Sequence, residues 1–489
     1  MNRILTTLFA FFVCLISHGQ DSMLLNLEQA ILQAQDYSQV SQLAKQRYLG
    51  SYYRNRSFWK GFYPEMSLSG TLPNINRSLQ SVVQPDGTEE FVQRSLNTTD
   101  LRLSLSQAIA PTGGRVFLSS GIQRIDLYGD NPSSSYLTTP LAISLSQPIF
   151  GYNSMRWDIK LREVQQDQFE KTYQEDLEEV ARVTANLFFR LLEADIMERT
   201  AKRNKSYNDT LYSISEGRYE MGKIAENELL QIELALLNSQ LALQRASLTR
   251  KLAELRLKNH IGHMGNERFT PFFAEEIPAV SVDMQKAMEY AFQNNSSQIQ
   301  WRYNKLNAER NVAQAKAEKT PEMDLFASYG RSQSADNIPS AYQNTESQEM
   351  VSLGFSIPIY DWGSNKSNYL AALADQKAND ANYNIAMLEF QEAIITSVQE
   401  FEMKYSELEI AKRAEEIATR RYRVSQQRFS IGKIGMTDMN IAMAEKDTAR
   451  RNYISSLQAF WNSYYNIRKI THYDFETNTE ITHPTPTPR

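Results

Sequence analysis

The chain has 489 residues, a net charge of −5 and 42% hydrophobic residues, enough for two or three ordinary domains or one large elongated architecture. The acidic balance argues against a general nucleic-acid binder, because proteins that follow phosphate backbones usually carry an excess of basic residues. With only 19 glycines and 15 prolines, the chain is neither collagen-like nor of low complexity. A single cysteine, Cys14, excludes an intramolecular disulfide and a cysteine-based metal site.

The N-terminus has the pattern of a secretory signal peptide. Arg3 supplies a positive charge, residues 4–16 are mostly apolar, and Gly19 is a small residue at the expected cleavage position. We therefore expect residues 1–19 to be removed on export, leaving a mature chain without cysteine. No later segment has 18 uninterrupted apolar residues, so the sequence predicts no transmembrane helix, and any membrane-inserted part has to consist of strands.

Short segments recur in the same order at constant offsets, which indicates an internal duplication. Two segments recur 257 residues later: Asn26–Ala30 as Asp283–Ala287, and Tyr63–Met66 as Thr320–Met323. Two others recur 210 residues later: Gln147–Tyr152 as Ile357–Trp362, and Arg218–Ile224 as Arg428–Ile434. The first copy therefore holds 47 more residues than the second, all between Pro64 and Pro148.

Residues 24–61 have helical composition, and after Pro64 the hydrophobic pattern changes to period two. Leu101, Leu103 and Leu105, for example, alternate with polar residues. This alternation predicts strands with one apolar and one polar face, as in a lipid-facing barrel wall around a wet lumen; the edge of a soluble β-sandwich is the alternative. The expected strands are 64–84, 90–109, 114–128 and 138–150 in the first copy, and 322–333 and 349–359 in the second.

Two long helical stretches follow the first set of strands, at about 153–220 and 224–260. The second stretch carries a leucine seam with the spacing of a left-handed coiled coil. The seam consists of Leu230, Leu234, Leu237, Leu241, Leu248, Leu252 and Leu255. The corresponding region of the second copy has a less regular apolar seam, formed by Met439, Met443, Tyr453, Leu457, Phe460, Tyr464 and Ile467.

From about residue 24 to 470 the sequence resembles the TolC-like outer-membrane efflux family. The resemblance is carried by the duplicated helix starts, the Tyr63-Pro64 and Thr320-Pro321 strand entries, the strand exits at Pro148 and Pro358, and the Arg-aromatic-x-x-Gly helix ends. It implies a mixed fold: a membrane β-barrel plus a long α-helical coiled-coil barrel, formed by internally duplicated chains as a homotrimeric tunnel.

This family pattern divides the chain into five parts. The expected boundaries are a signal peptide (1–19), a first repeat (20–262) with strands 64–150 and a hairpin tip near 222, a linker in the equatorial region (263–282), a second repeat (283–473) with strands 322–359 and a tip near 432, and a flexible tail (474–489).

The two tips are the main candidate sites. A glycine at a helix C-terminus commonly supplies the left-handed conformation that lets the chain reverse. In the family, the equivalent exposed turns also dock a periplasmic adaptor. The resemblance therefore assigns adaptor contact to Met221, Gly222, Lys223, Ile431, Gly432 and Lys433.

Six residues after each tip glycine there is an acidic residue, Glu228 or Asp438. Family members carry an acidic constriction at the periplasmic mouth, so the resemblance implies that six such carboxylates in a trimer form a cation-favouring gate. The alternative is that both acids simply complement the positive end of their helices. The family commonly has a further acid at the position of Ile441, so this ring is less charged than is typical.

We find no catalytic motif and expect neither an enzyme nor a cofactor. His260 and His263 form a His-x-x-His pair without acidic ligands at helical spacing, so we do not expect a metal site. The expected function is a passive outer-membrane channel with its helical tunnel in the periplasm, joined to an inner-membrane transporter through a periplasmic adaptor (membrane fusion) protein. It contacts outer-membrane lipid and no nucleic acid. A structural periplasmic coiled-coil or adaptor protein without a pore is the alternative, and an exported enzyme comes third.

The 47 extra residues leave the number of barrel strands open. If all six expected strands cross the membrane, a trimer closes eighteen strands instead of the twelve usual in the family. If the extra residues instead form an extracellular hairpin, the barrel keeps twelve strands. A short turn at Pro111–Gly114 favours the first arrangement, and polar segments such as Arg124–Asp126 favour the second.

Overall fold

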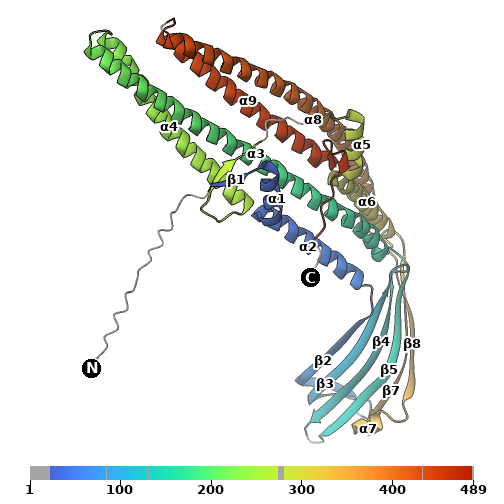
Figure 1. Ribbon diagram of the computed structural model, residues 1–489. Coiled ribbons are helices and arrows are strands. Elements are labelled where there is room, and N and C mark those ends of the chain that lie inside the picture. Colours follow the sequence, from blue (N-terminus) through green and yellow to red (C-terminus); the bar gives the residue numbers. More distant parts are fainter. Residues whose placement is uncertain (1–21, 84, 130–131, 274–279, 432, 487–489) are drawn as a thin grey trace, which may run out of the picture. The chain divides into compact units, whose positions relative to one another are not determined.

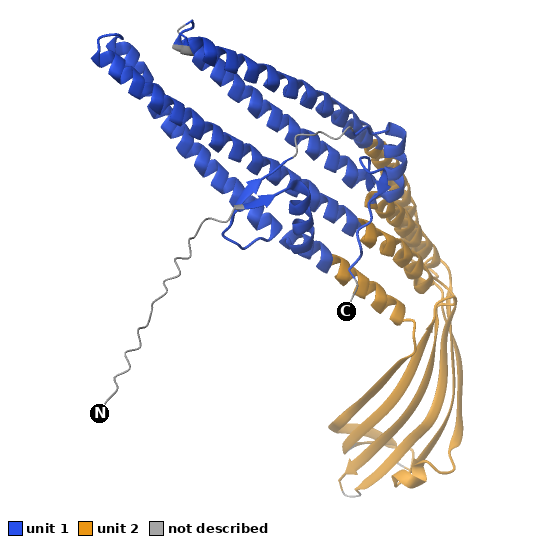
Figure 2. Cartoon of the chain, viewed as in Figure 1, with its two compact units in different colours: residues 1–46, 172–295, 391–487 blue, residues 47–171, 296–390, 488–489 orange. Residues whose placement is uncertain are grey.

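The computed structural model describes residues 22–83, 85–129, 132–273, 280–431 and 433–486 (Figure 1). The expected signal peptide and Gly432 lie outside these residues. The chain divides into two compact units (Figure 2). Unit 1 comprises residues 1–46, 172–295 and 391–487, and unit 2 comprises residues 47–171, 296–390 and 488–489.

Helices come in two sets of equal length. The first set is α1 (Leu27–Tyr37), α2 (Gln39–Lys60), α3 (Ser154–Glu220) and α4 (Glu226–Ile261), with 11, 22, 67 and 36 residues. The second set repeats these four lengths in order: α5 (Met284–Asn294), α6 (Ser296–Ala317), α8 (Ser364–Ser430) and α9 (Met436–Thr471). A one-turn helix, α7 (Ile338–Ala341), lies between two strands of unit 2.

The first helix of each set begins in the same way. Asn26 Oδ1 accepts a hydrogen bond from the Gln29 amide at 2.7 Å, and Asp283 Oδ1 accepts one from the Lys286 amide at 2.7 Å. A side-chain oxygen at this position satisfies an amide group that has no partner within the helix. Both helices then bury alanines at equivalent positions, among them Ala30 and Ala287.

Unit 1 contains a row of four helices in the order α4, α3, α9, α8 (Figure 1). The Arg250–Asp195 ion pair at 2.8 Å joins α4 to α3. Between α3 and α9, Asn204 Nδ2 donates to Asp447 Oδ2 at 2.9 Å. The rings of Phe401 and Phe460, 5.3 Å apart, join α8 to α9. The helices α4 and α8 therefore lie at the two edges of the row.

Two small strand pairs also belong to unit 1. Strand β1 (Ser22–Leu25) pairs in parallel with β6 (Arg268–Pro271), and β9 (Tyr473–Asp474) pairs with β10 (Thr479–Glu480) in antiparallel orientation. After β10, His483 Nε2 lies 2.9 Å from the Glu178 carboxylate on α3. This part of the segment expected to be a flexible tail therefore packs against the helices.

The leucine seam expected to form a coiled coil is exposed on α4. Its seven leucines are 45–59% exposed, whereas the face of α4 that packs within the chain carries Ile232, Arg250, Glu254, Leu257 and Ile261. The seam of α9 is mostly buried, with Phe460 and Tyr464 no more than 1% exposed. At the 210-residue offset, Phe460 and Tyr464 correspond to Arg250 and Glu254, not to leucines of the α4 seam. The two seams therefore occupy different faces of corresponding helices, and the α4 seam lies outside the buried face of its helix.

Unit 2 contains one antiparallel sheet of six strands in chain order. The strands are β2 (Glu65–Val83), β3 (Glu89–Ile109), β4 (Gly114–Tyr128), β5 (Ser133–Phe150), β7 (Glu322–Ala335) and β8 (Glu346–Ser356). Each overlaps a strand expected from the period-two pattern. Register shifts, for example between Ser119 and Gly121, interrupt the ladder and allow the sheet to bend.

Candidate functional site

The tip between α3 and α4 is a helix cap of the Schellman type. The Gly222 amide donates to the Tyr219 carbonyl at 2.8 Å, and the Lys223 amide donates to the Arg218 carbonyl at 2.9 Å. Gly222 has a φ of 66°, the left-handed conformation that this cap requires. No atom lies within 4 Å of a Cβ built on Gly222, so the backbone conformation is the constraint at this position, and space is not.

The tip between α8 and α9 has the same long-range bond. The Lys433 amide donates to the Arg428 carbonyl at 2.9 Å, which is the equivalent of the Lys223–Arg218 bond at an offset of 210 residues. The glycine of this tip, Gly432, lies outside the described part of the chain. The chain reversal predicted from the sequence is therefore present at both tips.

Each tip presents an apolar side chain next to a lysine. Met221 is 61% exposed and Ile431 is 65% exposed, and Lys223 and Lys433 are both exposed. Large apolar side chains at the end of a hairpin make few contacts within their own chain. These positions are therefore free to contact another protein.

The candidate gate acids lie in the first turns of α4 and α9. Glu228 and Asp438 are both exposed. Neither helix has a side-chain N-cap, because Ala225 and Gly435 occupy the cap positions. The negative charge of Glu228 or Asp438 thus compensates the unpaired amides of its helix start. The α4 start also contains Glu226, an acid that the comparison of the two copies did not single out because Met436 is its counterpart.

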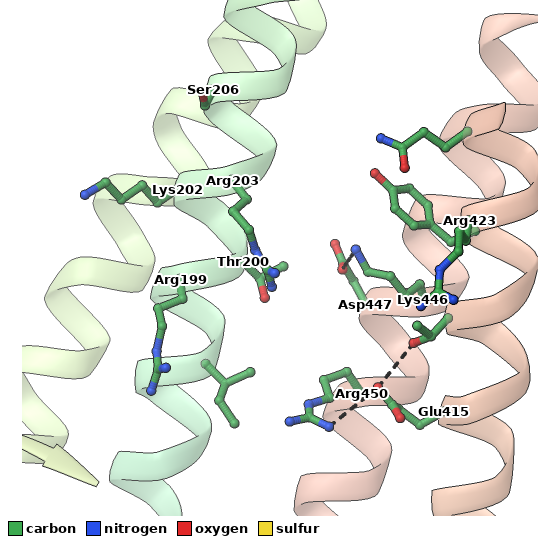
Figure 3. A pocket seen from close by; sticks show the side chains of 14 residues that line it. Arg199, Thr200, Lys202, Arg203, Ser206, Glu415, Arg423, Lys446, Asp447 and Arg450 are labelled. Carbon is green, nitrogen blue, oxygen red and sulfur yellow. Dashed lines mark hydrogen bonds and ion pairs between the residues drawn. The ribbon is translucent and has the colours of Figure 1, made fainter. Parts of the chain in front are cut away.

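A cavity of about 880 Å³ lies between α3 on one side and α8 and α9 on the other (Figure 3). Six of its 14 lining residues are basic: Arg199, Lys202, Arg203, Arg423, Lys446 and Arg450. Two are acidic, Glu415 and Asp447, and they lie 3.5 Å from Arg450 and 3.2 Å from Lys446 respectively. These residues come from three helices distant in the sequence, so no local pattern identifies them as a group.

The histidine pair has local partners. His260 Nε2 lies 3.1 Å from Thr184 Oγ1, and burial lowers the pKa of His260. His263 Nε2 lies 3.0 Å from a Glu267 carboxylate oxygen. Within the described ranges, no group of three or more His, Cys, Asp or Glu side chains is arranged to hold a metal ion.

Among the residues that the structure describes, no helix combines the length and the hydropathy that a membrane span requires.

The fold is that of the TolC-like outer-membrane channels, as comparison with solved structures shows. The outer-membrane channel CmeC of Campylobacter jejuni matches with a TM-score of 0.66 and 15% identity, covering 94% of this chain and 87% of CmeC. VceC of Vibrio cholerae matches with a TM-score of 0.63 and 14% identity, covering 91% and 95%. The open-state channel MtrE of Neisseria gonorrhoeae matches with a TM-score of 0.60 and 14% identity, covering 94% and 91%.

The family model "Outer membrane efflux protein" matches residues 115–263 and 290–471, together more than half of the chain. The chain therefore belongs to the outer membrane efflux protein family. The comparison with curated proteins found no match.

This result confirms the resemblance, the outer-membrane location and the main function expected from the sequence. The chain is an outer-membrane efflux channel of a tripartite system, whose other parts are an adaptor and an inner-membrane pump. The family does not support the alternative of an adaptor without a pore.

Proposed function

We propose that the chain acts as a homotrimer that closes a β-barrel in the outer membrane and a helical tunnel in the periplasm. The observation that carries this proposal is a pair of exposed apolar stripes on the two edge helices of unit 1. The trimer is a conduit without catalytic activity or a bound cofactor, and the direction of transport comes from its partner pump.

The first stripe is the leucine seam of α4. The second runs along α8 at intervals of seven residues and contains Met403, Ile410, Ile417 and Val424, which are 48–66% exposed. Seven-residue spacing is the period at which coiled-coil helices meet. Because the stripes lie on opposite edges of the row, α4 of one chain pairs with α8 of the next, and three copies close a ring. Because each leucine is already about half covered in the single chain, burying the rest contributes about 1 kcal/mol per leucine.

The sheet of unit 2 also supports a closed ring of three chains. Its edge strands are β2, which follows α2, and β8, which precedes α8, so the two edges run in opposite directions. Nearly all side chains of both strands are exposed. An open edge is a liability in a membrane, where every backbone amide needs a partner. Antiparallel pairing of β2 with β8 of the neighbouring chain removes both edges.

Exposed aromatic side chains lie where the strands of unit 2 meet its helices. Tyr63 follows α2, and Tyr360 and Trp362 follow β8, with exposures of 66%, 72% and 87%. The Tyr360 and Trp362 rings lie 4.6 Å apart. Aromatic belts of this kind mark the membrane–water interface of barrels, so we assign these residues to the periplasmic edge of the outer-membrane lipid.

The equal lengths and equivalent caps of the two helix sets support the division into repeats at residues 20–262 and 283–473, joined by 263–282. Residues 1–19 are the signal peptide and residues 474–489 the C-terminal tail in this scheme. Duplication gives each chain two hairpins of equal length, and three chains then supply six hairpins for the tunnel.

The experiment that tests this function is fractionation of cells that express the full chain. We expect an SDS-resistant trimer in the outer-membrane fraction. A monomer in the soluble periplasmic fraction would contradict the proposal.

We assign adaptor docking to Met221, Gly222, Lys223, Ile431, Gly432 and Lys433. Gly222→Val should impair export several-fold while the trimer still assembles. A β-branched residue disfavours a positive φ by about 1–2 kcal/mol, so the tip turn changes shape. The measurement is export of a marker compound in cells, together with the trimer level on gels.

The matched control for this substitution is Gly217→Val. Gly217 also has no atom within 4 Å of a built Cβ, but it lies inside α3 with an ordinary helical conformation. This control should retain export. If Gly222→Val exports normally, the tip does not dock the adaptor through this turn.

We assign the periplasmic gate to Glu228 and Asp438. Replacing both with Gln and Asn should lower the preference for cations and weaken block by multivalent cations, because a ring of like charges concentrates the field in a narrow mouth. Conductance in planar bilayers measures both effects. The control is Glu226→Gln, because Glu226 lies in the same turn as Glu228 but has no acidic counterpart in the second copy. Unchanged selectivity in the double variant would show that the two acids only compensate their helix starts.

A further inference from the structure

We infer that the barrel of the trimer contains eighteen strands, and that its pore admits solutes too wide for a twelve-stranded barrel. This inference rests on the proposed trimer and deepens it. It starts from the six strands per chain, two more than the four that a twelve-stranded trimer requires.

The two additional strands, β3 and β4, are paired on both sides along their length. Strand β3 pairs with β2 from Glu89 to Ser106 and with β4 from Ser95 to Ile109. Strand β4 in turn pairs with β5 from Arg115 to Leu127. The additional hairpin is therefore an integral part of the sheet. A hairpin folded outside the sheet would lack one of these two ladders.

The alternation of faces continues through the additional strands. One row of directly opposed residues crosses the sheet as Met66, Leu105, Leu118, Ile143 and Tyr329. The next row, on the opposite face, crosses it as Ser67, Ser104, Ser119, Ala142 and Gly330. In these two rows an apolar face and a small, polar face extend from β2 to β7. This is the pattern of a wall between lipid and a wet lumen, and β3 and β4 share it with their neighbours.

The turn of the additional hairpin lies at the helix end of the sheet. Asn153, just before α3, donates from Nδ2 to the Ala110 carbonyl at 3.0 Å and to the Pro111 carbonyl at 3.3 Å. The same side chain accepts from the Arg156 amide at 3.1 Å and so caps α3. A Cβ on Gly113 would lie 3.1 Å from Asn153, so the turn is closely packed. The hairpin therefore spans the sheet from the helix end to the far end, which contradicts an extracellular hairpin over a four-stranded sheet.

Strand length and barrel geometry then set the pore size. Strands β3 and β4 have 21 and 15 residues, more than the roughly 9–11 needed to cross the membrane. With strands about 4.8 Å apart and tilted by about 40°, eighteen strands give a backbone diameter of ~35 Å and twelve give ~24 Å. The difference of ~11 Å is the width of one α-helix with its side chains. The eighteen-stranded barrel therefore lets pass solutes that a twelve-stranded barrel would exclude.

The first experiment places a cysteine in the turn. Thr112→Cys, in a mature chain that is otherwise free of cysteine, should react with a membrane-impermeant thiol reagent only after the outer membrane is permeabilised. Asp86→Cys, in the loop between β2 and β3, is the matched control and should react in intact cells. Reaction of Thr112→Cys in intact cells would overturn the inference, whether or not the chain is a trimer.

The second experiment measures the pore. Polyethylene glycol of a diameter between the two estimated pores, added from the barrel side in planar bilayers, should enter the wild-type trimer and lower its conductance. A variant lacking residues 89–128, which joins β2 to β5 through the remaining loop, should exclude the same polymer. Exclusion by the wild-type trimer would overturn the inference while leaving the proposed function intact, whereas absence of a trimer would reject the proposed function itself. If the deletion variant does not fold, strand counting in electron-microscopy maps of the wild-type trimer decides between eighteen and twelve.

Discussion

Replacing Leu241 and Leu248 with glutamate should abolish the SDS-resistant trimer while each chain keeps its helices. Both leucines belong to the exposed stripe of α4, at 45% and 59% exposure, and make no part of the face that packs within the chain. In the proposed interface each half-exposed leucine contributes about 1 kcal/mol, and an unpaired charge in its place costs several kcal/mol more. The measurement is the oligomeric state on gels and by light scattering, with helix content from circular dichroism.

The matched control is Ala242→Glu with Thr249→Glu. These exposed residues follow the two leucines directly, and the control adds the same charge to another face of the same helix. It should leave the trimer intact. Ile410→Glu with Ile417→Glu on α8 should reproduce the loss, because the proposal pairs this stripe with α4 of the neighbouring chain. A stable trimer in both stripe variants would show that other surfaces hold the chains together.

Local patterns predicted the elements of this fold well. The period-two segments became strands, and glycine at Gly222 marked the helix reversal because only one backbone conformation closes that turn. The helix predicted at 24–61 is divided in two at Ser38, whose amide donates to the Ala34 carbonyl while its hydroxyl accepts from the Ser41 amide. A serine that offers such alternative hydrogen bonds can end a helix. The composition of residues 24–61 remains typical of a helix, so composition alone does not predict this break.

The partner of an apolar seam could not be predicted from its spacing. The α4 leucines have heptad spacing, but the α3-facing side of α4 carries Arg250 and Glu254, which a pattern of hydrophobic residues does not detect. Heptad spacing indicates that an apolar seam exists. Only the contacts of the other faces of the helix show whether the seam packs within its own chain or is left exposed. Sequence patterns also did not predict the cavity lined by six basic residues, because those residues come together only when α3, α8 and α9 pack.

Arg250 is a buried side chain whose loss should strongly destabilise unit 1. It is 3% exposed and donates from Nε to Asp195 and from Nη1 to Glu254, both at 2.8 Å, and from Nη2 to the Phe269 carbonyl at 2.6 Å. Glu254 also accepts from the Phe269 amide at 2.8 Å. One guanidinium therefore holds α3, α4 and β6 together, and only its planar fork can reach all three acceptors.

Arg250→Met fills a similar space but leaves Asp195 and Glu254 buried without their shared cation. Removing one partner of a buried ion pair typically costs about 3–5 kcal/mol, so the variant should unfold at clearly lower temperature or urea concentration than the wild type. Arg250→Lys should recover only part of the loss, since an ammonium group cannot form the three-way fork. Lys251→Met, an exposed neighbour on the same helix, is the control and should change little.

The pH dependence of this loss distinguishes a missing charge from poorer packing. In the wild type, burial raises the pKa of Glu254, but the hydrogen bond from the Phe269 amide and the Arg250 charge outweigh burial and hold this pKa below the ordinary value of a glutamate. A lowered pKa in the folded state contributes stability above the unfolded pKa, and this contribution is lost as the pH falls. Without Arg250 the part of this contribution that comes from the Arg250 charge is lost, while the Phe269 amide and Lys258 still lower the pKa of Glu254. The deficit of Arg250→Met should therefore be largest at neutral pH and shrink as the pH falls below about 4.5. A deficit that stays constant across this range would assign the effect to packing alone.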